Sequence, residues 1–227
     1  MTATVLKLSA LWEAVDLIPT REEWNNALTE RNGKKLQTKF SSTTVAVCGL
    51  GGLGSGTAVC LARAGIGKLI LIDFDTVDIT NLHRQQYKAN QIGVYKTDAL
   101  FENLKEIAPY TVLETHTERV TEENAERLLQ GADIICEAFD SAEAKAMLTN
   151  LVLEKMPDKF FVAASGMAGF GSGNSIRTRK ITGRFYLCGD GQSDVQTEGS
   201  LVSSRVMLCA AHQAHTVLRI LAEQFEA

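Results

Sequence analysis

The chain has 227 residues, a formal net charge of −4, 45% hydrophobic residues and 22% charged residues. Length and composition are typical of one folded domain, and the mildly acidic balance does not favour nucleic-acid binding. No apolar run in the sequence approaches the length of a membrane-spanning helix, and the N-terminus lacks the pattern of a secretory signal. We therefore expect a single cytoplasmic domain over residues 1–227 that binds neither nucleic acid nor membrane.

Residues 1–40 are expected to form an N-terminal helical arm, in which a helix over Leu11–Glu30 would serve dimerisation. From residue 45 onward, apolar runs alternate with helix-forming segments. The expected strands are Val45–Cys48, Lys68–Ile72, Thr111–Thr115, Ile134–Ala138 and Phe160–Ala164. The expected helices are Ser55–Ala64, Lys96–Ile107, Thr121–Gln130 and Ala142–Glu154. This alternation predicts an α/β fold with a doubly wound, mostly parallel Rossmann-like sheet.

The last part of the chain departs from this alternation. Ser175–Thr182 alternates polar with branched residues, which predicts a strand or hairpin with Phe185–Leu187. The sheet should therefore end in a small antiparallel extension. Val206–Phe225 has apolar residues at helical spacing and is expected to pack one stripe into the core or a dimer interface.

A glycine motif follows the first strand. Gly49 permits a tight turn, Gly51 lets a phosphate approach the backbone, and Gly54 allows close packing of the helix, whose first N–H groups can then face an anion. Asp73 ends the second strand, roughly 20 residues farther on, where an acid can accept hydrogen bonds from a ribose. Alone, these features also fit an ordinary dinucleotide-binding unit.

The continuation is more specific. Asp73 begins the sequence DFDTVDITNLHRQ, and Gly93-Val-Tyr-Lys96 follows after a polar connection. This pattern, DxDxVxxxNLxRQ and then GxxK, resembles the ATP site of the ubiquitin-activating-like ThiF/MoeB/HesA family. The resemblance covers roughly Arg31 to the C-terminus. It implies ATP-dependent adenylation of the C-terminal glycine carboxylate of a ubiquitin-fold sulfur carrier protein.

The resemblance also assigns roles to residues. Asp73 would hold the ribose, Asn81 and Arg84 would contact the phosphates, Gln85 would support the loop, and Lys96 would reach the α-phosphate. As a set, the implied nucleotide-binding residues are Gly49, Gly51, Gly52, Gly54, Asp73, Asp75, Asn81, Arg84, Gln85 and Lys96. Outside this motif, Arg84 and Lys96 would be read as solvated surface charges.

Adenylation explains why these residue types are needed. A carboxylate that attacks the α-phosphate is already an anion and requires no general base, so the obstacle is repulsion between like charges. Positioning and neutralisation by cationic side chains and a metal meet that demand. The sequence therefore predicts ATP and magnesium as the cofactors.

Asp140 is the candidate magnesium ligand. It follows the expected strand Ile134–Ala138, at the sheet edge where ligands of open α/β sheets bind. Magnesium bound with ATP usually takes one or two carboxylates together with phosphates and waters. The family places its magnesium-binding aspartate here. The alternative role is an N-cap, because Glu143 follows three residues later, and the two roles are compatible.

An arginine from the partner subunit belongs to the family's dimeric ATP site. Arg31 is the residue we assign to this role, within ALTERNGKK before the first strand. Its distance from Gly49 is shorter than the family norm, so Arg21 is an alternative. A solvated helix charge is a further interpretation of Arg31.

The five cysteines are dispersed, and the sequence has no Cys-x-x-Cys pair of the kind that binds structural zinc in many relatives. Zinc is therefore not expected. Cys188 differs from the other four because it lies in FYLCGDG, beside turn residues. It is a candidate for the cysteine that ThiF-type enzymes use in sulfur transfer, and its alternative is a buried structural thiol at a strand end.

The substrate side is less specified. Gly166–Gly171 is a candidate lip for the groove that receives the carrier's Gly-Gly tail, or a flexible connection. The short C-terminal half and the FYLCGDG segment resemble the compact ThiF branch (family 2), which implies a ThiS-like carrier, thiamine biosynthesis and a homodimer. The alternatives are activation of a MoaD-type carrier for molybdopterin, an NAD(P)-dependent oxidoreductase, and a noncatalytic carrier-binding subunit.

Overall fold

The computed structural model describes residues 18–226. Its strands are β1 Thr44–Cys48, β2 Lys68–Ile72, β3 Val112–His116, β4 Ile134–Glu137, β5 Phe160–Ala164, β6 Arg177–Lys180 and β7 Phe185–Gly189. They form one seven-stranded sheet in the order β3-β2-β1-β4-β5-β7-β6. All neighbouring strands are parallel except β6 and β7, which pair antiparallel. The predicted α/β class, the mostly parallel sheet and its antiparallel extension are confirmed.

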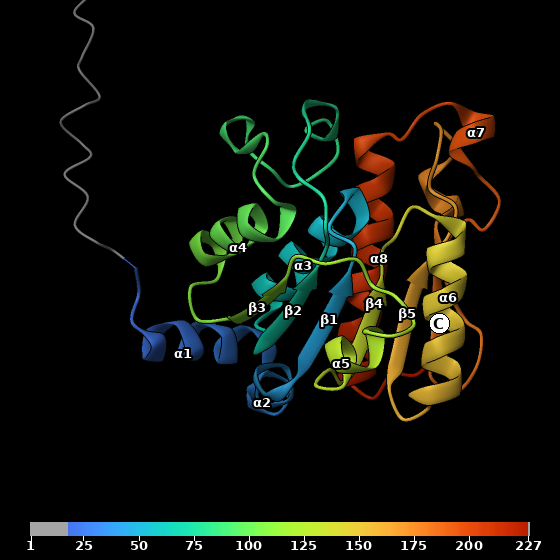
Figure 1. Ribbon diagram of the computed structural model, residues 1–227. Helices are drawn as coiled ribbons and strands as arrows, with labels where there is room; N and C mark the ends of the chain where they lie inside the picture. Colours follow the sequence, from blue (N-terminus) through green and yellow to red (C-terminus); the bar gives the residue numbers. More distant parts are fainter. Residues whose placement is uncertain (1–17, 227) are drawn as a thin grey trace, which may run out of the picture.

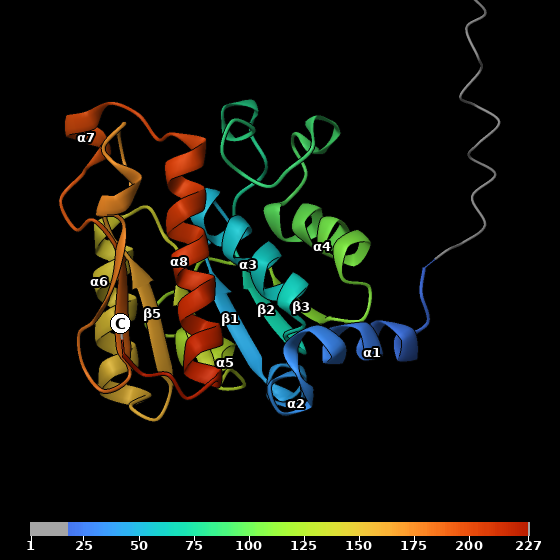
Figure 2. The same cartoon turned by 180° about the vertical axis from the view of Figure 1, so that it is seen from behind.

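Helices cover both faces of the sheet (Figure 1). They are α1 Arg21–Asn32, α2 Lys34–Ser42, α3 Gly52–Ala64, α4 Lys96–Ile107, α5 Ala125–Leu129, α6 Ala142–Lys155, α7 Val195–Glu198 and α8 Ser203–Leu221, with short 3-10 turns at Ile79–Asn81, Ala89–Gln91 and Gly173–Ser175. The view from behind shows α3, α4 and α8 together on one face (Figure 2), while α5 and α6 lie on the other. This is the doubly wound arrangement.

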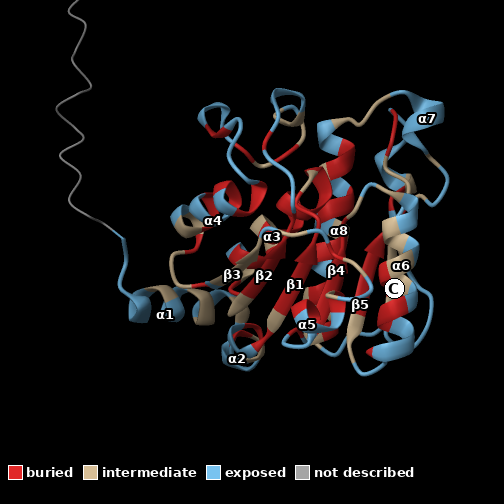
Figure 3. Cartoon of the chain, in the orientation of Figure 1, coloured by how far each residue is buried: buried red, intermediate tan, exposed pale blue. Residues whose placement is uncertain are grey.

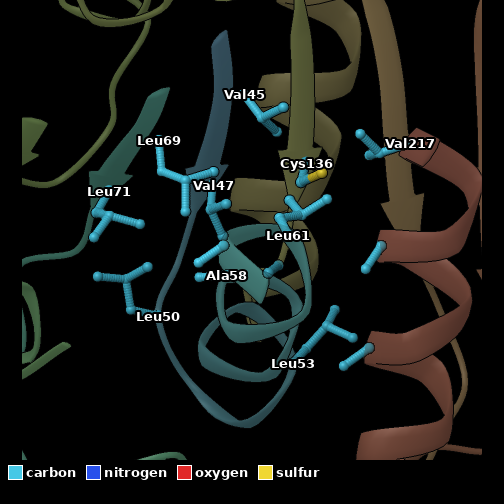
Figure 4. Packing of buried hydrophobic residues seen from close by; sticks show 14 of the residues in the cluster. Val45, Val47, Leu50, Leu53, Ala58, Leu61, Leu69, Leu71, Cys136 and Val217 are labelled. Atoms are coloured by element: carbon cyan, nitrogen blue, oxygen red, sulfur yellow. The ribbon is translucent and has the colours of Figure 1, made fainter. Parts of the chain in front are cut away.

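Strand β1 lies at the centre of the packing because it is buried on both faces. Val45 and Val47 belong to the apolar cluster on the α3 and α8 face, whereas Ala46 and Cys48 belong to the cluster on the α5 and α6 face. Alternate residues of a strand point to opposite faces, so a strand covered on both sides reads as a continuous apolar run. Figure 4 shows Val45 and Val47 packed with Leu61 of α3. Buried residues accordingly concentrate along the central strands (Figure 3).

The chain reverses its direction of winding beside β1. From β1 it proceeds outward to β2 and β3, and then crosses to β4 on the other side of β1. In open α/β sheets the carboxyl ends of two such strands flank a crevice where ligands bind. The segments after β1 and β4 therefore define the place to look for a site.

Several helices differ from their predicted bounds, and hydrogen bonds explain the difference at two of them. The first described helix begins at Arg21, because the Thr20 hydroxyl accepts a hydrogen bond from the Glu23 amide and Glu23 caps Thr20 in return. The earlier part of the predicted Leu11–Glu30 helix falls largely outside the described residues. Helix α5 covers only the second half of Thr121–Gln130, because the Asn124 side chain accepts from the Thr121 amide and holds the segment before Ala125 in a turn.

Candidate functional site

The turn after β1 requires glycine at two positions. Gly49 has a φ of +90°, and a Cβ placed on it would lie 2.7 Å from the carbonyl oxygen of Ala138. A Cβ on Gly54 would lie 1.8 Å from the Gly49 carbonyl oxygen. A Cβ on Gly51, in contrast, would meet only Gln85, at 3.9 Å. Packing thus explains Gly49 and Gly54, whereas Gly51 faces open space, as expected of a backbone that a ligand approaches.

Helix α3 begins at this turn without a side-chain cap. Its N-cap is Gly51, which has no side chain to accept hydrogen bonds from the first amides. The first N–H groups of a helix have no partners within the helix, and the helix dipole makes that end attractive to anions. Residues 49–54, called here the glycine loop, therefore present backbone donors suited to a phosphate.

Asp73 is buried and ties two loops together. Its Oδ2 accepts a hydrogen bond from the Leu50 amide at 2.6 Å, and its Oδ1 accepts from the Asp75 amide at 2.8 Å. Burial raises the pKa of Asp73, although the charge of Lys96 and the two backbone N–H groups counteract it. Each carboxylate oxygen has a second lone pair. Asp73 can therefore fix the glycine loop and still accept a hydrogen bond from a ribose.

Lys96 lies at the start of α4 and pairs with Asp75. Its Nζ is 2.9 Å from Asp75 Oδ2, and its side chain is only 8% exposed, compared with 47% for Asp75. The Lys96 amide also donates to the Asp75 carbonyl. An ammonium group has three N–H donors and Asp75 occupies one of them. The structure thus places Lys96 beside both acids of the DFD sequence, with donors left for a phosphate.

The segment that contains Asn81, Arg84 and Gln85 lies over the glycine loop. Asn81 shapes it, because its Oδ1 accepts from the Asp78 amide at 3.1 Å and its carbonyl accepts from the Gln85 amide. Gly52 packs beneath Arg84, since a Cβ on Gly52 would be 3.2 Å from Arg84 Cγ. Within the described chain, the buried Gln85 Oε1 has no hydrogen-bond partner. The packing of Arg84 on Gly52 holds Arg84 at the start of α3.

Asp140 reaches the same edge from β4. It is exposed, and the N-cap of α6 is Ser141, whose hydroxyl accepts from the Ala144 amide. The capping role considered for Asp140 is therefore wrong, and its carboxylate is available. Burial lowers the pKa of the half-buried Arg84, and the negative charge of Asp140 partly offsets this effect. The charge of Asp140, beyond the end of β4, thus acts on Arg84, which packs at the start of α3.

A buried ion pair that the sequence analysis missed supports the Asp140 turn. Lys145 Nζ lies 3.0 Å from Glu137 Oε1 and donates to the Ala164 carbonyl at 2.9 Å. The same Glu137 oxygen accepts from the Phe139 amide at 2.7 Å. Burial raises the pKa of Glu137, and Lys145 opposes the shift. The sequence contained one signal for this ion pair, which is the acidic residue Glu137 at the end of an otherwise apolar strand.

Arg31 is not brought to this site. Helix α1 lies at the opposite edge of the sheet from the loops that follow β2 (Figure 1), and Asn32, next to Arg31, donates to the carbonyl of Ala64 at the far end of α3. Arg21, the alternative, lies on the same helix, and its guanidinium is 5.3 Å from the ring centre of Tyr110. Neither arginine lies at the site of its own chain. An arginine of α1 can therefore reach such a site only in a second copy of the chain.

Cys188 does not lie in a mobile loop. It is fully buried within β7, and its sulfur is 3.6 Å from Thr178 Oγ1 and 3.7 Å from Thr216 Oγ1. Burial raises the pKa of its thiol, and the two hydroxyls oppose this only in part. A reactive cysteine needs access and an electropositive environment. The geometry favours the structural alternative over the sulfur-transfer role.

Two further properties of the described residues concern metal binding and membranes. No group of three or more His, Cys, Asp or Glu side chains in residues 18–226 is arranged to hold a metal ion. None of the helices in that range combines the length and the hydropathy needed to cross a membrane. Any metal at Asp140 would therefore depend on ligands from outside the protein, such as phosphates and waters.

The model of the ThiF family matches residues 25–226. The chain belongs to the ThiF family. Among its relatives, the adenylyltransferase and sulfurtransferase UBA4 of Lodderomyces elongisporus is 33% identical over 153 residues, which cover 67% of this chain and 33% of that protein. The adenylyltransferase and sulfurtransferase MOCS3 of Aedes aegypti is 35% identical over 127 residues, which cover 55% of this chain and 29% of that protein. The chain thus spans about a third of the length of these relatives.

Solved structures share the fold. The tRNA N6-threonylcarbamoyladenosine dehydratase TcdA of E. coli, in complex with ATP, superposes with a TM-score of 0.79 at 21% identity, covering 89% of this chain and 95% of that one. MccB of E. coli with ATP gives a TM-score of 0.65 at 22% identity, covering 85% and 59%. At this identity the likeness concerns the fold, which in both cases has been crystallised with ATP.

Proposed function

We propose that this ThiF-family chain uses ATP to adenylate the C-terminal glycine carboxylate of a ThiS-like, ubiquitin-fold sulfur carrier protein in thiamine (thiazole) biosynthesis. The observation that supports the proposal is the presence of three features beyond the carboxyl ends of β1 and β4. These are the uncapped start of α3, Arg84 packed on Gly52, and the exposed carboxylate of Asp140. Backbone N–H groups and a guanidinium bind phosphates, while a lone carboxylate suits a metal that accompanies them.

The reaction needs little covalent help from the protein. A carboxylate oxygen of the carrier attacks the α-phosphorus, a new O–P bond forms, the bond to the β-phosphate oxygen breaks, and pyrophosphate leaves with the electron pair. The product is an acyl-adenylate. Donors aimed at the phosphates reduce the repulsion between the two anions. In the proposed site the glycine loop, Arg84 and Lys96 supply these donors, and Asp73 holds the ribose.

Magnesium fits the residues present. Asp140 is exposed and does not cap α6, so its carboxylate can bind a cation that also contacts ATP. When bound, magnesium would neutralise charge on the triphosphate. Nearby, Lys145 and the buried Glu137 fix the turn from Glu137 to Phe139 that leads to Asp140.

The relatives' names support the adenylation step, because UBA4 and MOCS3 are both called adenylyltransferases. A nicotinamide-dependent oxidoreductase would use the glycine loop and Asp73 as well, but hydride transfer has no need for Arg84 and Lys96. A noncatalytic carrier-binding subunit would have no need to keep them together with Asp140. The presence of these residues together therefore favours a catalytic adenylating enzyme over the two alternatives.

Exchange of labelled pyrophosphate into ATP tests the proposal. We expect exchange that depends on a ThiS-like carrier ending in Gly-Gly and is lost with the same carrier lacking its last glycine. Intact mass should show an AMP adduct on the carrier. A MoaD-like carrier in parallel distinguishes the molybdopterin alternative. Absence of carrier-dependent exchange with either carrier contradicts the proposal, and tight NADH binding without an ATP-induced thermal shift would support an oxidoreductase.

The proposal includes a homodimer in which Arg31 of one copy completes the site of the other. Mixed dimers test this directly. Arg31→Ala and Asp140→Asn variants, each inactive alone, should regain about a quarter of wild-type exchange when co-refolded in equal amounts, because about half of the dimers are then mixed and each mixed dimer contains one site with both intact residues. Recovery by Arg21→Ala in place of Arg31→Ala would transfer the role to Arg21. No recovery with either arginine variant contradicts the in-trans role.

A further inference from the structure

Arg205, in the first turn of α8, is buried and makes a fork of hydrogen bonds. Its Nη1 donates to the carbonyl of Gly171 at 2.5 Å and to that of Ser172 at 2.8 Å. Its Nη2 donates to Ser175 Oγ at 3.1 Å and pairs with the carboxylate of Asp190. One guanidinium thus binds both segments that flank the paired strands β6 and β7, the segment before β6 and the segment after β7.

Asp190 organises the second of these segments. Its Oδ1 accepts from the amides of Gln192 and Ser193, at 2.8 and 2.9 Å, while its other oxygen contacts Arg205. Although desolvation acts in the opposite direction, these hydrogen bonds hold the pKa of Asp190 to about 2. The carboxylate is therefore ionised at any physiological pH. We call Arg205 and Asp190, with the backbone that they bind, the clamp.

Glycines let the clamped segments approach each other closely. A Cβ on Gly166 would lie 2.0 Å from Asp190 Oδ1, and one on Gly171 would lie 3.3 Å from the Arg205 guanidinium. Gly169, between them, donates its amide to the carbonyl of Ser200. Residues 165–175 and 189–202, called here the acceptor loops, are thus fastened to each other and to α8. Gly166–Gly171 is the segment that the sequence analysis associated with the carrier's tail.

The clamp also adjoins the glycine loop. Val206, next to Arg205, lies against Gly52, since a Cβ on Gly52 would be 2.9 Å from Val206 Cγ1. On the other side, His83 Nε2 is 3.2 Å from the carbonyl oxygen of Leu201, which places the acceptor loops beside the residue preceding Arg84. A shift at the start of α8 would therefore displace both the glycine loop and the acceptor loops.

A stability role alone accounts poorly for this arrangement. Desolvation of a buried ion pair offsets much of its Coulombic gain, so the geometry that such a pair fixes matters beyond its contribution to stability. Arg205 and Asp190 have exposed side-chain fractions of only 6% and 9%. Within residues 18–226, the hydrogen bonds of the two side chains go to loops and to a 3-10 turn, outside the strands of the sheet. What the clamp fixes is the position of the acceptor loops relative to the phosphate-facing end of α3.

We propose that Arg205 is a positioning residue that couples the acceptor loops to the glycine loop, so that ATP binding orders the path of the incoming carboxylate. This inference rests on the proposed adenylation for its purpose but not for its test. ATP settling on the start of α3 presses on Gly52 and Val206, and the clamp transmits that restraint to residues 165–175. A chain without the clamp would bind ATP normally but hold the acceptor's tail poorly.

Hydrogen–deuterium exchange measured by mass spectrometry tests the coupling without any carrier. In the wild-type protein, a nonhydrolysable ATP analogue should slow amide exchange in residues 49–54 and also in 165–175 and 189–193. In Arg205→Met, the protection of 49–54 should persist and that of the acceptor loops should disappear. Arg205→Lys should keep part of it. Arg219→Met is the matched control, because Arg219 is on the same helix and its side chain donates to Gln224 and to the Glu226 carbonyl, far from the clamp.

Kinetics separates positioning from general damage. With a responsive carrier, Arg205→Met should raise KM for the carrier at least tenfold while Kd for ATP changes less than twofold. If Arg205→Met does not fold, Asp190→Asn serves as the second variant. ATP-dependent protection of the acceptor loops that survives in Arg205→Met or Asp190→Asn overturns the inference. A wild-type protein without carrier-dependent exchange would instead contradict the adenylation proposal, and the amide-exchange result would still decide the coupling.

Discussion

The nucleotide side of the proposed site (residues 45–96) and its acceptor side (the acceptor loops with the start of α8) are built in different ways. The nucleotide side is local in sequence, because Asp73 binds Leu50 and Lys96 binds Asp75 within residues 45–96. The acceptor side depends on distant partners, such as Arg205 with Gly171 and His83 with Leu201. One half of the site can therefore be read as a motif, whereas the other exists only once the chain has folded.

The acids on the two sides also differ. Burial raises the pKa of Asp73, which two backbone amides and Lys96 only partly oppose. Asp190 has the reverse balance, and its hydrogen bonds hold its pKa to about 2. The nucleotide side thus contains a carboxylate whose ionised form is disfavoured by burial, as expected where a ligand will add further contacts. The acceptor side contains one that is already fully satisfied.

The largest expected effects come from the charges of the nucleotide side. Arg84→Met and Asp140→Asn should each lower kcat for pyrophosphate exchange by about 10²- to 10³-fold, because groups aimed at developing charge contribute this much in related chemistry. Arg63→Met is the control, since Arg63 is exposed and occupies the other end of α3. A decrease below about fivefold in either test variant, measured at saturating ATP and carrier, would be incompatible with their assigned roles.

The glycine loop should be the least tolerant backbone. Gly54→Ala would put a Cβ 1.8 Å from the Gly49 carbonyl oxygen, against backbone that cannot move aside without displacing β1. We expect the free energy of unfolding to fall by about 3 kcal/mol, with loss of ATP binding. Gly183→Ala has nothing within 4 Å and should change it by less than about 0.5 kcal/mol. Urea unfolding of the two variants measures both, and equal stabilities would refute the steric argument.

The contribution of the clamp to the free energy of unfolding should fall in acid, because it depends on the charge of Asp190. The Asp190 carboxylate has a pKa of about 2 when folded and an ordinary value of 3.8, so its stabilisation is present above pH 3.8 and is lost as the pH falls toward 2. Its size at neutral pH is about 2 kcal/mol. Asp190→Asn should therefore be less stable than wild type at pH 7, and the gap should narrow below pH 4.

Urea unfolding at several pH values between 7 and 3 gives this comparison. Asp158→Asn is a suitable control, since that side chain is 74% exposed and its ion pair with Lys159 spans 3.7 Å. It should follow wild type within about 0.5 kcal/mol at each pH. A gap between Asp190→Asn and wild type that stays constant from pH 7 to pH 3 would show that the charge of Asp190 contributes nothing.

Sequence reasoning succeeded where periodicity and glycine geometry decide the structure. Strands Lys68–Ile72 and Phe160–Ala164 and helix Lys96–Ile107 have the predicted bounds, and Gly49 and Gly54 have the tight contacts expected of them. It could not find the clamp, because Asp190 sits among turn residues and Arg205 directly precedes an apolar helical run, and neither position has a pattern that indicates its partner. Their partnership depends on how α8 packs beside β7, a tertiary fact that no local spacing encodes.

Local competition explains the remaining differences. Ser141 rather than Asp140 caps α6, because the extended backbone at Ser141 brings its hydroxyl to the Ala144 amide. Lys96 was assigned to a phosphate alone, whereas the turn from Asp73 to Asp75 also offers it a carboxylate. Arg31 lies on a helix at the far edge, where only quaternary structure can give it the predicted role. The sequence specifies such side chains, but neighbouring partners determine where they point.

The smallest expected effect concerns Cys188. It tests whether the acceptor side contains a reactive thiol or only structural residues. Burial raises the pKa of both thiols, but Cys188 is fully buried whereas Cys60 on α3 is only half-buried. Reaction of a thiol requires access to it, so a disulfide reagent should modify Cys60 first in the native protein and Cys188 only upon unfolding. Cys188→Ala should keep kcat for adenylation within twofold of wild type, and Cys60→Ser should remove the fast-reacting thiol. Labelling of native Cys188 at the rate of Cys60 would mean that β7 opens readily, and the acceptor side would then regain a candidate nucleophile for sulfur transfer.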